Sequence, residues 1–415
     1  MGFSQPLSGL SAQSQKLDTI SNNIANSQTV GFKSGDALFA DVFAGANSDV
    51  GLGVRVSDVR QNFNSGALEN TGRQLDLAIS GDGFFRLEQP NGEAVYSRNG
   101  QFSQDADGNI VNATGQFVTG FTEDGGAEPE RIQITREGLG ANATGSNDGV
   151  KAVYNLDASA SSDAADQESV TLEKTDGTDF GPFNYNFSNS FTAYDSLGNQ
   201  RIVSAYFTKT TTANTWDVQF AVDGVVDDAP TDGNKYQIVF NSDGTLDTSS
   251  GDVNAANGQL NSDVEFTSGQ NGLFDNEPDD LSFSFDLTGT TQFAGASTQN
   301  SLSQDGFAAG SLAGIEVQED GTIQKNYTNG ESVNAGQVAL ASFVNPEGLQ
   351  PDGDNNFRET GASGPANTGT PGAGLLGTVE SGVVENSNVD LASELVDTIV
   401  AQRAYQANST SISTQ

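Results

Sequence analysis

The side chains that most often do chemistry in enzymes are reduced here to carboxylates. The chain has no His and no Cys, which removes Ser-His-Asp triads, thiolate nucleophiles, disulfides and histidine metal sites together. The 55 Asp and Glu residues could still supply a carboxylate pair of the glycosidase kind, because distance along the sequence says nothing about distance in space. A solvated acidic surface explains the same residues and is the interpretation we favour. The sequence therefore predicts no catalytic residue and no cofactor.

Two acidic segments have part of the spacing of a calcium-binding loop. The segment "DADGNIVNATGQ" (105–116) has Asp105, Asp107 and Asn109 at positions 1, 3 and 5, but Ile110 stands where the loop requires Gly and Gln116 where it requires a bidentate Glu. The segment "DGDNNFRETGAS", which begins at Asp352, fails in the same way and ends on Ser363. Both segments are interpreted as turns, and no metal site is predicted.

A glycine-rich run, "SGDGFFRL" (80–87), lacks the spacing of a phosphate-binding loop and the Lys that would follow it. Gly81 and Gly83 are instead predicted to form a turn before a strand that carries Phe84 and Phe85.

The charge balance limits the partners of the chain. The formal net charge is −38, from 55 acidic and 17 basic residues, so nucleic acid and anionic membrane surfaces are not expected partners. No run of 18 or more apolar residues is present, and no membrane insertion is predicted. The N-terminus lacks the basic start and the apolar block of a cleaved signal peptide. If the chain is exported, we expect another route.

The elements that could position functional residues begin with an amphipathic N-terminal segment. Seven of its positions recur at intervals of four and three, the spacing of a coiled-coil seam. These positions are Phe3, Leu7, Leu10, Ser14, Leu17, Ser21 and Ile24. Ile20 extends the apolar face, but two of the seven positions are Ser, and a short helix of this kind does not stay formed alone in water. The spacing predicts a helix that needs a partner helix.

The C-terminal segment "NSNVDLASELVDTIVAQRAYQANS" supplies such a partner. Its apolar row, with one flanking valine, consists of Leu391, Leu395, Ile399 and Val396. Asn388 is the predicted N-cap, with Asp390 and Glu394 in or near the first turn, where negative charge meets the positive end of the helix dipole. We therefore predict that the two terminal helices pair; two surface helices packed on one globular domain are the alternative.

Three asparagines end the N-terminal helix, in "SNNIANSQTVGFKS" (21–34). Asparagine is a poor helix former, but the amides of Asn22, Asn23 and Asn26 can bond to backbone groups that are left unpaired where a helix ends. A simple helix stop would need only one of them.

Short β segments fill the region between the helices. Asp-Gly pairs at 107–108, 243–244 and 320–321 are each followed by Ile or Leu, and we predict a hairpin tip at each. Segments such as "IVSAYF", "WDVQFAV" and "YQIVF" are rich in residues that favour strands. The predicted fold is a mainly β, multi-domain protein with discontinuous domains, in which the N- and C-terminal α-helices pair as a coiled-coil-like terminal domain.

Charge and composition predict a nested division of the chain. Residues 151–300 hold 23 acidic and 5 basic side chains, and Gly-rich stretches bracket this block. The predicted parts are a terminal helical domain (1–25 with 383–415), a linking segment (26–72 with 372–382), a β domain (73–150 with 305–371) and an inserted acidic β domain (151–304).

Three segments together resemble the axial proteins of the bacterial flagellum, the family of rod and hook proteins. They are "SGLSAQSQKLDTISNNIANSQTVGFKS", "VGLGVRVSDVRQNFNSGALENTGRQLDLAISGDGFFRL" and "ASELVDTIVAQRAYQANS". The resemblance covers roughly the first 150 residues and everything from about 305 onward. Rod-type members are much shorter and lack a large insert, so a chain of 415 residues resembles the hook-type members.

The resemblance implies a structural protein and not an enzyme. Such proteins polymerise with copies of themselves into a flexible curved tube, a universal joint that passes motor torque from rod to filament. The apolar positions of the terminal helices would be self-assembly contacts in an inner layer around a channel. The segment with the three asparagines would be a hinge to the outer β domains, with Gly31 permitting the bend and Phe32 anchoring it.

The resemblance also implies partners and a location. The partners would be rod proteins, hook-filament junction proteins and the hook cap during assembly. The protein would lie outside the cell in the flagellum, exported by type III secretion without a cleaved signal peptide. Members of the family continue past "AQRAYQANSTSISTQ" with a few more turns of apolar helix, so we expect this chain to be truncated or to have a short C-terminal helix.

Two other interpretations remain open at this point. Within the family, a distal rod or hook-filament junction protein would carry the same terminal segments. Outside it, a secreted acidic adhesin or carbohydrate-binding β protein would explain the acidic β middle.

Overall fold

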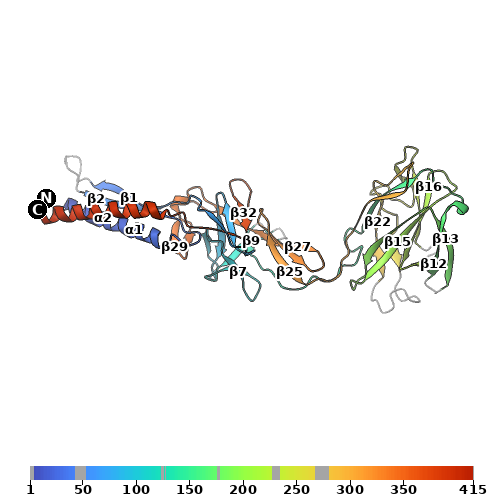
Figure 1. Ribbon diagram of the computed structural model, residues 1–415, viewed down its shortest axis with the longest axis horizontal. Helices are drawn as coiled ribbons and strands as arrows, with labels where there is room; N and C mark the ends of the chain where they lie inside the picture. The colour runs from blue at the N-terminus through green and yellow to red at the C-terminus, as the bar shows by residue number, and fades with distance from the viewer. Residues whose placement is uncertain are drawn as a thin grey trace. The chain divides into compact units, whose positions relative to one another are not determined.

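The chain folds into two compact units, each made of discontinuous segments. The computed structural model describes residues 4–42, 53–122, 126, 128–174, 178–226, 234–266 and 280–414. Unit 1 consists of Met1–Arg136, Ala313–Asn326 and Ser332–Gln415, and unit 2 of Glu137–Leu312 and Tyr327–Glu331. The predicted mainly β fold with discontinuous domains and paired terminal helices is confirmed (Figure 1). The predicted division into four parts is finer and stays a prediction.

Two long helices form one end of unit 1. Helix α1 spans Ser4–Ala25 and helix α2 spans Leu391–Thr414. The two helices run in opposite directions side by side, with both chain ends at the same end of the pair (Figure 1). Pro6 lies in the first turn of α1, where the missing N–H has no partner within the helix in any case.

A β-hairpin packs against α1. Strands β1 (Gly35–Val42) and β2 (Gly53–Gln61) pair antiparallel and both contact α1. The Ser8 hydroxyl accepts a hydrogen bond from the backbone N–H of Val54 at 3.2 Å. The chain therefore leaves the helix, returns along it as the hairpin and only then enters the β body of unit 1.

A large sheet forms the β body of unit 1. Its strands are β5 (Phe84–Glu88), β6 (Ala94–Ser97), β7 (Phe102–Gln104), β8 (Ile110–Asn112), β9 (Phe117–Phe121), β10 (Glu130–Arg131), β25 (Leu312–Val317), β26 (Thr322–Tyr327), β27 (Ser332–Val338), β28 (Leu340–Ser342), β29 (Gln350–Gly353), β30 (Asn356–Arg358) and β31 (Asn367–Gly369). The main path is β25-β26-β27-β9-β5-β6-β30-β29. Three strands from the last third of the chain are thus followed by three from the first third and by two more from the last third, so both ends of the chain build one sheet.

Two smaller antiparallel pairs close the β body. Strand β3 (Leu68–Asn70) pairs with β33 (Val383–Glu385), and β4 (Leu77–Ser80) pairs with β32 (Thr378–Ser381). Each pair joins a segment that follows the hairpin to a segment that precedes α2. The core beneath them is apolar and fully buried at Phe85 and Leu87, with a second aromatic cluster around Phe84 and Tyr96.

Unit 2 is built from two main sheets and a short strand pair. Its strands are β11 (Val150–Asp157), β12 (Glu168–Lys174), β13 (Asp179–Tyr185), β14 (Phe187–Tyr194), β15 (Gln200–Lys209), β16 (Thr215–Val222), β17 (Val225–Val226), β18 (Lys235–Phe240), β19 (Leu246–Gly251), β20 (Val264–Phe266), β21 (Leu281–Phe283), β22 (Phe285–Asp286), β23 (Thr291–Phe293) and β24 (Thr298–Gln304). One sheet follows the order β13-β12-β17-β16-β15-β14, and the other is centred on β11. Their facing apolar side chains make a single core, in which Trp216 is fully buried and donates to the Gln292 side chain at 2.7 Å.

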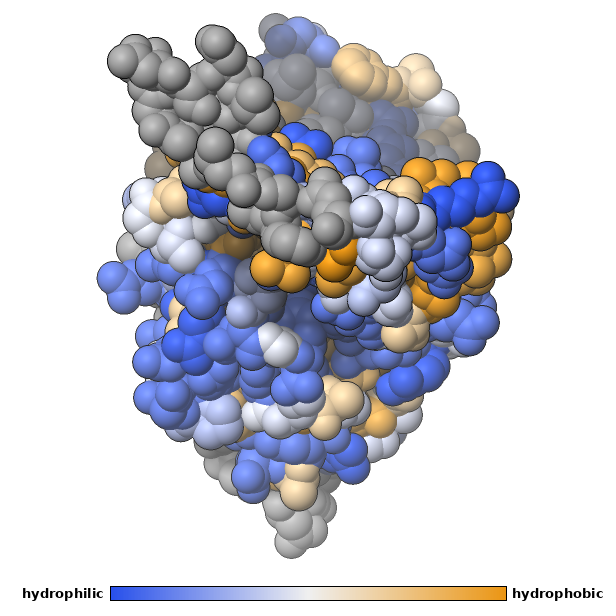
Figure 2. All heavy atoms as spheres, turned by 90° about the vertical axis from the view of Figure 1, so that its left-hand side faces the viewer, coloured by the Kyte–Doolittle hydropathy of each residue, from blue (hydrophilic) through white to orange (hydrophobic). Residues whose placement is uncertain are grey.

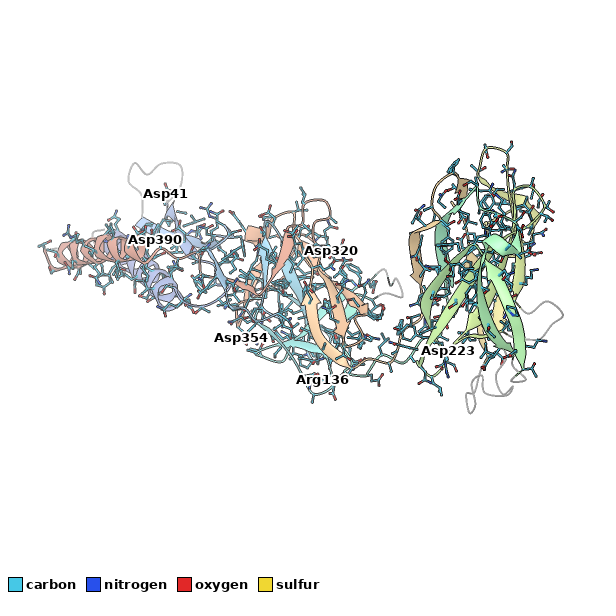
Figure 3. All side chains as sticks on the ribbon, turned by 45° about the vertical axis from the view of Figure 1, so that its right-hand side comes forward. Asp41, Arg136, Asp223, Asp320, Asp354 and Asp390 are labelled. Atoms are coloured by element: carbon cyan, nitrogen blue, oxygen red, sulfur yellow. The ribbon has the colours of Figure 1, made fainter. Side chains whose placement is uncertain are left out.

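The predicted turns are confirmed. The Asp-Gly pairs at 107–108, 243–244 and 320–321 connect β7 to β8, β18 to β19 and β25 to β26; Asp320 is labelled in Figure 3. In the first calcium-like segment Asp105 accepts from the backbone N–H groups of Asp107 and Asn109 at 2.9 and 2.8 Å. In the second, Arg358 pairs with Asp352 at 2.8 Å across the β29-β30 hairpin. One carboxylate of each segment, that of Asp105 and that of Asp352, thus has its partners within its own turn.

The glycine-rich run also matches its prediction. Gly81 and Gly83 have φ angles of 112° and 127°, a region that favours glycine, and β5 begins at Phe84.

Candidate functional site

The terminal helices pair through small residues. Ala12 of α1 is 2% exposed and Ala401 of α2 is 1% exposed, and of the described residues of α2, Ala401 is the buried one. A Cβ atom added to Gly9 would lie 2.9 Å from the side-chain nitrogen of Asn408. The helices therefore approach closely where side chains are short or absent.

The predicted apolar row of α2 is not part of this contact. Leu395 is 54% exposed, Val396 60% and Ile399 51%, and Leu391 is also exposed. With 3.6 residues per turn, this row lies on the opposite side of α2 from Ala401. The pairing of the helices is confirmed, but the apolar row points away from α1.

The predicted apolar positions of α1 are also partly exposed. Ile20 is buried, whereas Leu7 is 60% exposed and Leu10, Leu17 and Ile24 are half-buried. Phe3 lies outside the described residues. Figure 2, viewed from the side of the chain ends, shows hydrophobic surface beside hydrophilic surface on that face. Each helix thus keeps apolar side chains in contact with solvent within a single copy.

The start of α2 differs from its prediction. Asp390, labelled in Figure 3, is the N-cap: its carboxylate accepts from the backbone N–H of Ala392 at 2.9 Å. Asn388, the predicted cap, instead accepts from the N–H of Ser34 at 2.8 Å and donates to the carbonyl of Asn62 at 2.7 Å. The prediction of Asn388 as the cap is wrong, because its amide can bond to two other chain segments at once.

Asn23 ties three elements together. It is 2% exposed, its amide nitrogen donates to the carbonyl of Gly35 and to the carboxylate of Glu394, both at 2.9 Å, and its amide oxygen accepts from the N–H of Gly35 at 3.0 Å. Burial raises the pKa of Glu394, and the hydrogen bond from Asn23 opposes that rise. One amide thus holds the end of α1, the start of β1 and the first turn of α2.

The other two asparagines close the end of α1. The Asn26 amide nitrogen donates to the backbone and side-chain oxygens of Asn22, both at 3.0 Å. The Thr29 hydroxyl donates to the Asn26 side chain at 3.1 Å. These bonds satisfy groups at the helix end, as the sequence suggested.

Gly31 lies where the chain turns toward the β body. Its φ is +71°, and an added Cβ would lie 2.5 Å from the backbone nitrogen of Asn99. Its own N–H donates to the carbonyl of Glu385 at 2.7 Å. Phe32 is half-buried and lines a cleft of about 290 Å³ with Asn22 and Asn26.

Next to Gly31 lies a cluster of buried charges that the sequence did not predict. Lys33 Nζ is 2.7 Å from Glu385 Oε1, and Arg98 Nη1 is 3.5 Å from Glu385 Oε2. All three side chains are almost completely buried. Burial lowers the pKa of Lys33 and that of Arg98, and in both cases the Glu385 carboxylate acts against the shift. Lys33 and Glu385 are distant in sequence, so no spacing pattern could have joined them.

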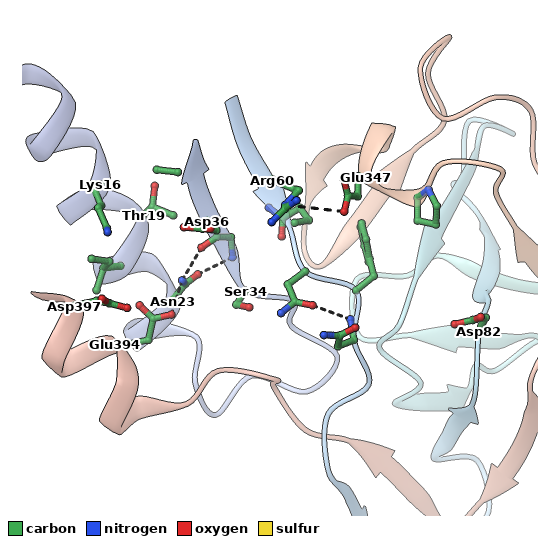
Figure 4. A pocket seen from close by; sticks show the side chains of 18 residues that line it. Lys16, Thr19, Asn23, Ser34, Asp36, Arg60, Asp82, Glu347, Glu394 and Asp397 are labelled. Carbon is green, nitrogen blue, oxygen red and sulfur yellow. Dashed lines mark hydrogen bonds and ion pairs between the residues drawn. The ribbon is translucent and has the colours of Figure 1, made fainter. Parts of the chain in front are cut away.

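A polar cleft of about 690 Å³ lies beside the helix pair (Figure 4). Lys16 from α1 and Glu394 and Asp397 from α2 line one part of it, and Arg60 and Glu347, 4.0 Å apart, line another. Among the described residues, no group of three or more possible metal ligands is close enough to hold an ion.

Relatives that align over the whole length of the chain show which family it belongs to. The chain is 42% identical over 422 residues to the flagellar hook protein FlgE of Escherichia coli (strain K12), an alignment that covers 100% of this chain and 97% of the relative. The chain belongs to the flagellar hook protein family. Members from more distant bacteria align equally far. Identity is 33% to the hook protein FlgE of Rhizobium meliloti (97% and 93% covered) and 30% to that of Borreliella burgdorferi (98% and 95% covered).

Family profiles match the successive parts of this hook-family chain. Residues 7–33 match the flagella basal body rod protein profile, 78–150 the flagellar hook protein FlgE/F/G D1 domain, 155–307 the flagellar basal body protein FlaE D2 domain, and 380–415 the flagellar basal body rod FlgEFG protein C-terminal profile. The family is one of structural proteins.

A solved structure supports the fold. The crystal structure of Helicobacter pylori flagellar hook protein FlgE2 superposes with a TM-score of 0.50 at 13% identity, covering 75% of this chain and 99% of that one. In the part of this chain that the structure describes, no helix has both the length and the apolar character of a membrane span.

Proposed function

We propose that this chain is the structural subunit of the flagellar hook and that it polymerises with copies of itself through its terminal helices. The observation that carries the proposal is the apolar row of α2, Leu391, Leu395, Val396 and Ile399, which faces solvent in one copy. Full-length similarity to proteins named flagellar hook protein supports the assignment to the hook.

Exposed apolar rows on a paired helix favour association. A helix with one buried Ala and an open row of Leu, Val and Ile gains free energy when a second copy covers that row, at about 25 cal/mol per Å² of apolar surface removed from water. Leu7, Leu10, Leu17 and Ile24 of α1 are partly or largely exposed and can take part in the same layer. A close intrachain contact through Gly9, Ala12 and Ala401 leaves these larger side chains available.

In this proposal the segment from Asn22 to Phe32 is the hinge between the helical layer and the β domains. Asn23 and Gly31 hold its two ends, and Phe32 anchors it in the cleft that it lines. Residues 151–304, which lie within the acidic unit 2, form the outer part of the polymer. Their polar surface suits contacts that slide when the tube bends.

The polymer acts outside the cell as a flexible joint that passes torque along the flagellum. Its ends meet rod proteins on one side and hook-filament junction proteins on the other, and a hook cap serves during assembly. No catalytic step is part of the proposal.

Electron microscopy of the concentrated chain tests the proposal. We expect tubes of uniform diameter with a central channel. Straight short rods of a few copies would favour a distal rod protein instead, and a chain that stays monomeric at every concentration would contradict the proposal. The test requires the whole chain, because both terminal helices contribute to the proposed contact.

A further inference from the structure

The buried charge cluster, Lys33, Arg98 and Glu385, lies where the chain passes between the helices and the β body of unit 1. Two segments connect the helices and their hairpin to the β body, the one after the β1-β2 hairpin and the one before α2. The segment after α1 passes beside them on its way to the hairpin. Glu385 Oε1 accepts from Lys33 Nζ on the segment after α1 and from the backbone N–H of Gly66 on the segment after the hairpin, both at 2.7 Å. Glu385 itself belongs to the segment before α2. A single carboxylate therefore contacts both covalent connections and the end of the segment that follows α1.

The β body holds the same carboxylate from its other side. Arg98 follows strand β6, and its Nη2 atom donates to the carbonyl of Gly81 at 2.9 Å. Strand β33, which ends at Glu385, pairs with β3. The Glu385 side chain is 0% exposed, so no solvent replaces these contacts.

The stability of the cluster depends on the negative charge of Glu385. A buried charge is strongly unfavourable unless an opposite charge and hydrogen bonds compensate for lost hydration. Lys33 and Arg98 are both cations, and Glu385 is the acidic residue that the structure pairs with each of them. Without the Glu385 charge, two buried cations would face each other, and Asp82, whose effect on Arg98 is smaller than that of Glu385, would be the carboxylate left to act on Arg98. Without Lys33, the Arg98–Glu385 pair would remain.

We propose that Glu385 is a positioning residue that fixes the terminal helices on the β body by drawing Lys33 and Arg98 together. The importance of this fixation rests on the function proposed above, since load on the helices must reach the β domains through these two connections. The contact itself exists within one copy and does not need the polymer.

Chymotrypsin cleavage after Phe32 of the dilute full-length chain tests the proposal, with the 33–415 fragment measured by mass spectrometry. Cleavage at a protected site follows the population in which the site is open. Removing one partner of a buried pair is strongly destabilising, so we expect Glu385→Gln to increase the cleavage rate at least about a hundredfold. Glu130→Gln is the matched control, because Glu130 is an exposed carboxylate on strand β10 of the same β body and should change the rate by less than about threefold.

A second substitution separates charge from packing. Adding Lys33→Met to Glu385→Gln removes one of the two unpaired cations. Because Lys33 directly follows the cleaved bond, each rate is divided by that of an unfolded peptide with the same residues around the bond, and we expect this ratio to fall at least about tenfold from that of the single variant. Loss of packing alone would make the double variant the more rapidly cleaved one. If Glu385→Gln unfolds unit 1, circular dichroism replaces the cleavage rate as the measurement, and we expect the added Lys33→Met to restore the spectrum of the folded unit.

The outcomes distinguish this inference from the proposed function. Unchanged cleavage in Glu385→Gln, or faster cleavage in the double variant, overturns the role of Glu385 even if the parent chain forms tubes. The expected pattern in a chain that forms no tubes supports the role of Glu385 and rejects the hook assignment.

Discussion

Substitution of Leu395 by Asp separates assembly from folding. Leu395 is 54% exposed on the face of α2 opposite Ala401, so the isolated chain should lose no more than about 0.5 kcal/mol of stability. In the proposed polymer a second copy covers this side chain. Full burial of a Leu side chain contributes about 1.5–3 kcal/mol. Because roughly half of Leu395 is still exposed in one copy, replacing it removes about 1 kcal/mol of association free energy for each copy.

The introduced carboxylate adds a larger effect. A charge forced into an apolar contact without a partner costs several kcal/mol after relaxation. The sum is about 3–5 kcal/mol for each copy, which corresponds to an increase of about two to four powers of ten in the critical concentration for polymerisation. The expected result is a folded monomer that does not form tubes at concentrations where the parent chain does.

Sedimentation of polymer across a concentration series measures the critical concentration, and Trp216 fluorescence with circular dichroism confirms that the monomer is folded. Ile202→Asp is the matched control: Ile202 is 57% exposed on β15 of unit 2, so the chemical change and exposure are the same but the helices are untouched. A critical concentration for Leu395→Asp within about threefold of that for Ile202→Asp would refute the reasoning.

Three further predictions concern folding of the single chain. Ala401→Leu places a large side chain in the 1% exposed contact between the helices and should destabilise unit 1 by about 1–3 kcal/mol in urea unfolding, whereas the exposed Ala392→Leu should change it by less than about 0.5 kcal/mol. Gly31→Ala places a Cβ atom at a φ of +71° and 2.5 Å from the backbone of Asn99. It should therefore be more destabilising than Gly115→Ala, where φ is +80° and nothing lies within 4 Å. Equal losses of stability in the two variants, about 1–3 kcal/mol each, would show that the approach to Asn99 does not matter. Asp305 is desolvated, which favours its neutral form, but backbone N–H groups of Gly145, Asn147 and Asp148 outweigh this and lower its pKa. Because the folded pKa lies below the unfolded value, this stabilisation is present above pH 3.8 and is lost as the pH falls through the folded pKa. Asp305→Asn should lower the thermal midpoint reported by Trp216 at pH 7, by an amount that shrinks in acid; an equal loss at all pH values would contradict the assignment.

The local features of this fold could be predicted from the sequence because their causes are local. The hairpin tips at the Asp-Gly pairs follow from backbone angles that few residues tolerate. The terminal helices follow from a periodic apolar pattern, and Asn22 and Asn26 bond within their own helix end. In each case, the partners lie within a few residues of one another.

The features that were missed depend on distant partners. The Asn388 amide had the right type for a helix cap, but Asp390 was nearer the helix start, and Ser34 and Asn62 gave Asn388 other partners. The cluster of Lys33, Arg98 and Glu385 joins three parts of the chain, and no periodicity marks any of its members. The two helices were predicted correctly, but the apolar row of α2 is exposed and does not face α1, because an apolar pattern does not say which surface covers it.

Cryo-electron microscopy of the assembled polymer tests the central claim most directly, because a density map with resolved side chains shows what covers α2. The account predicts that Leu395, Val396 and Ile399 are buried against the helices of neighbouring copies, while Gly9 and Asn408 keep their close approach within each copy. A polymer in which these α2 side chains face solvent and copies meet only through their β domains would contradict it.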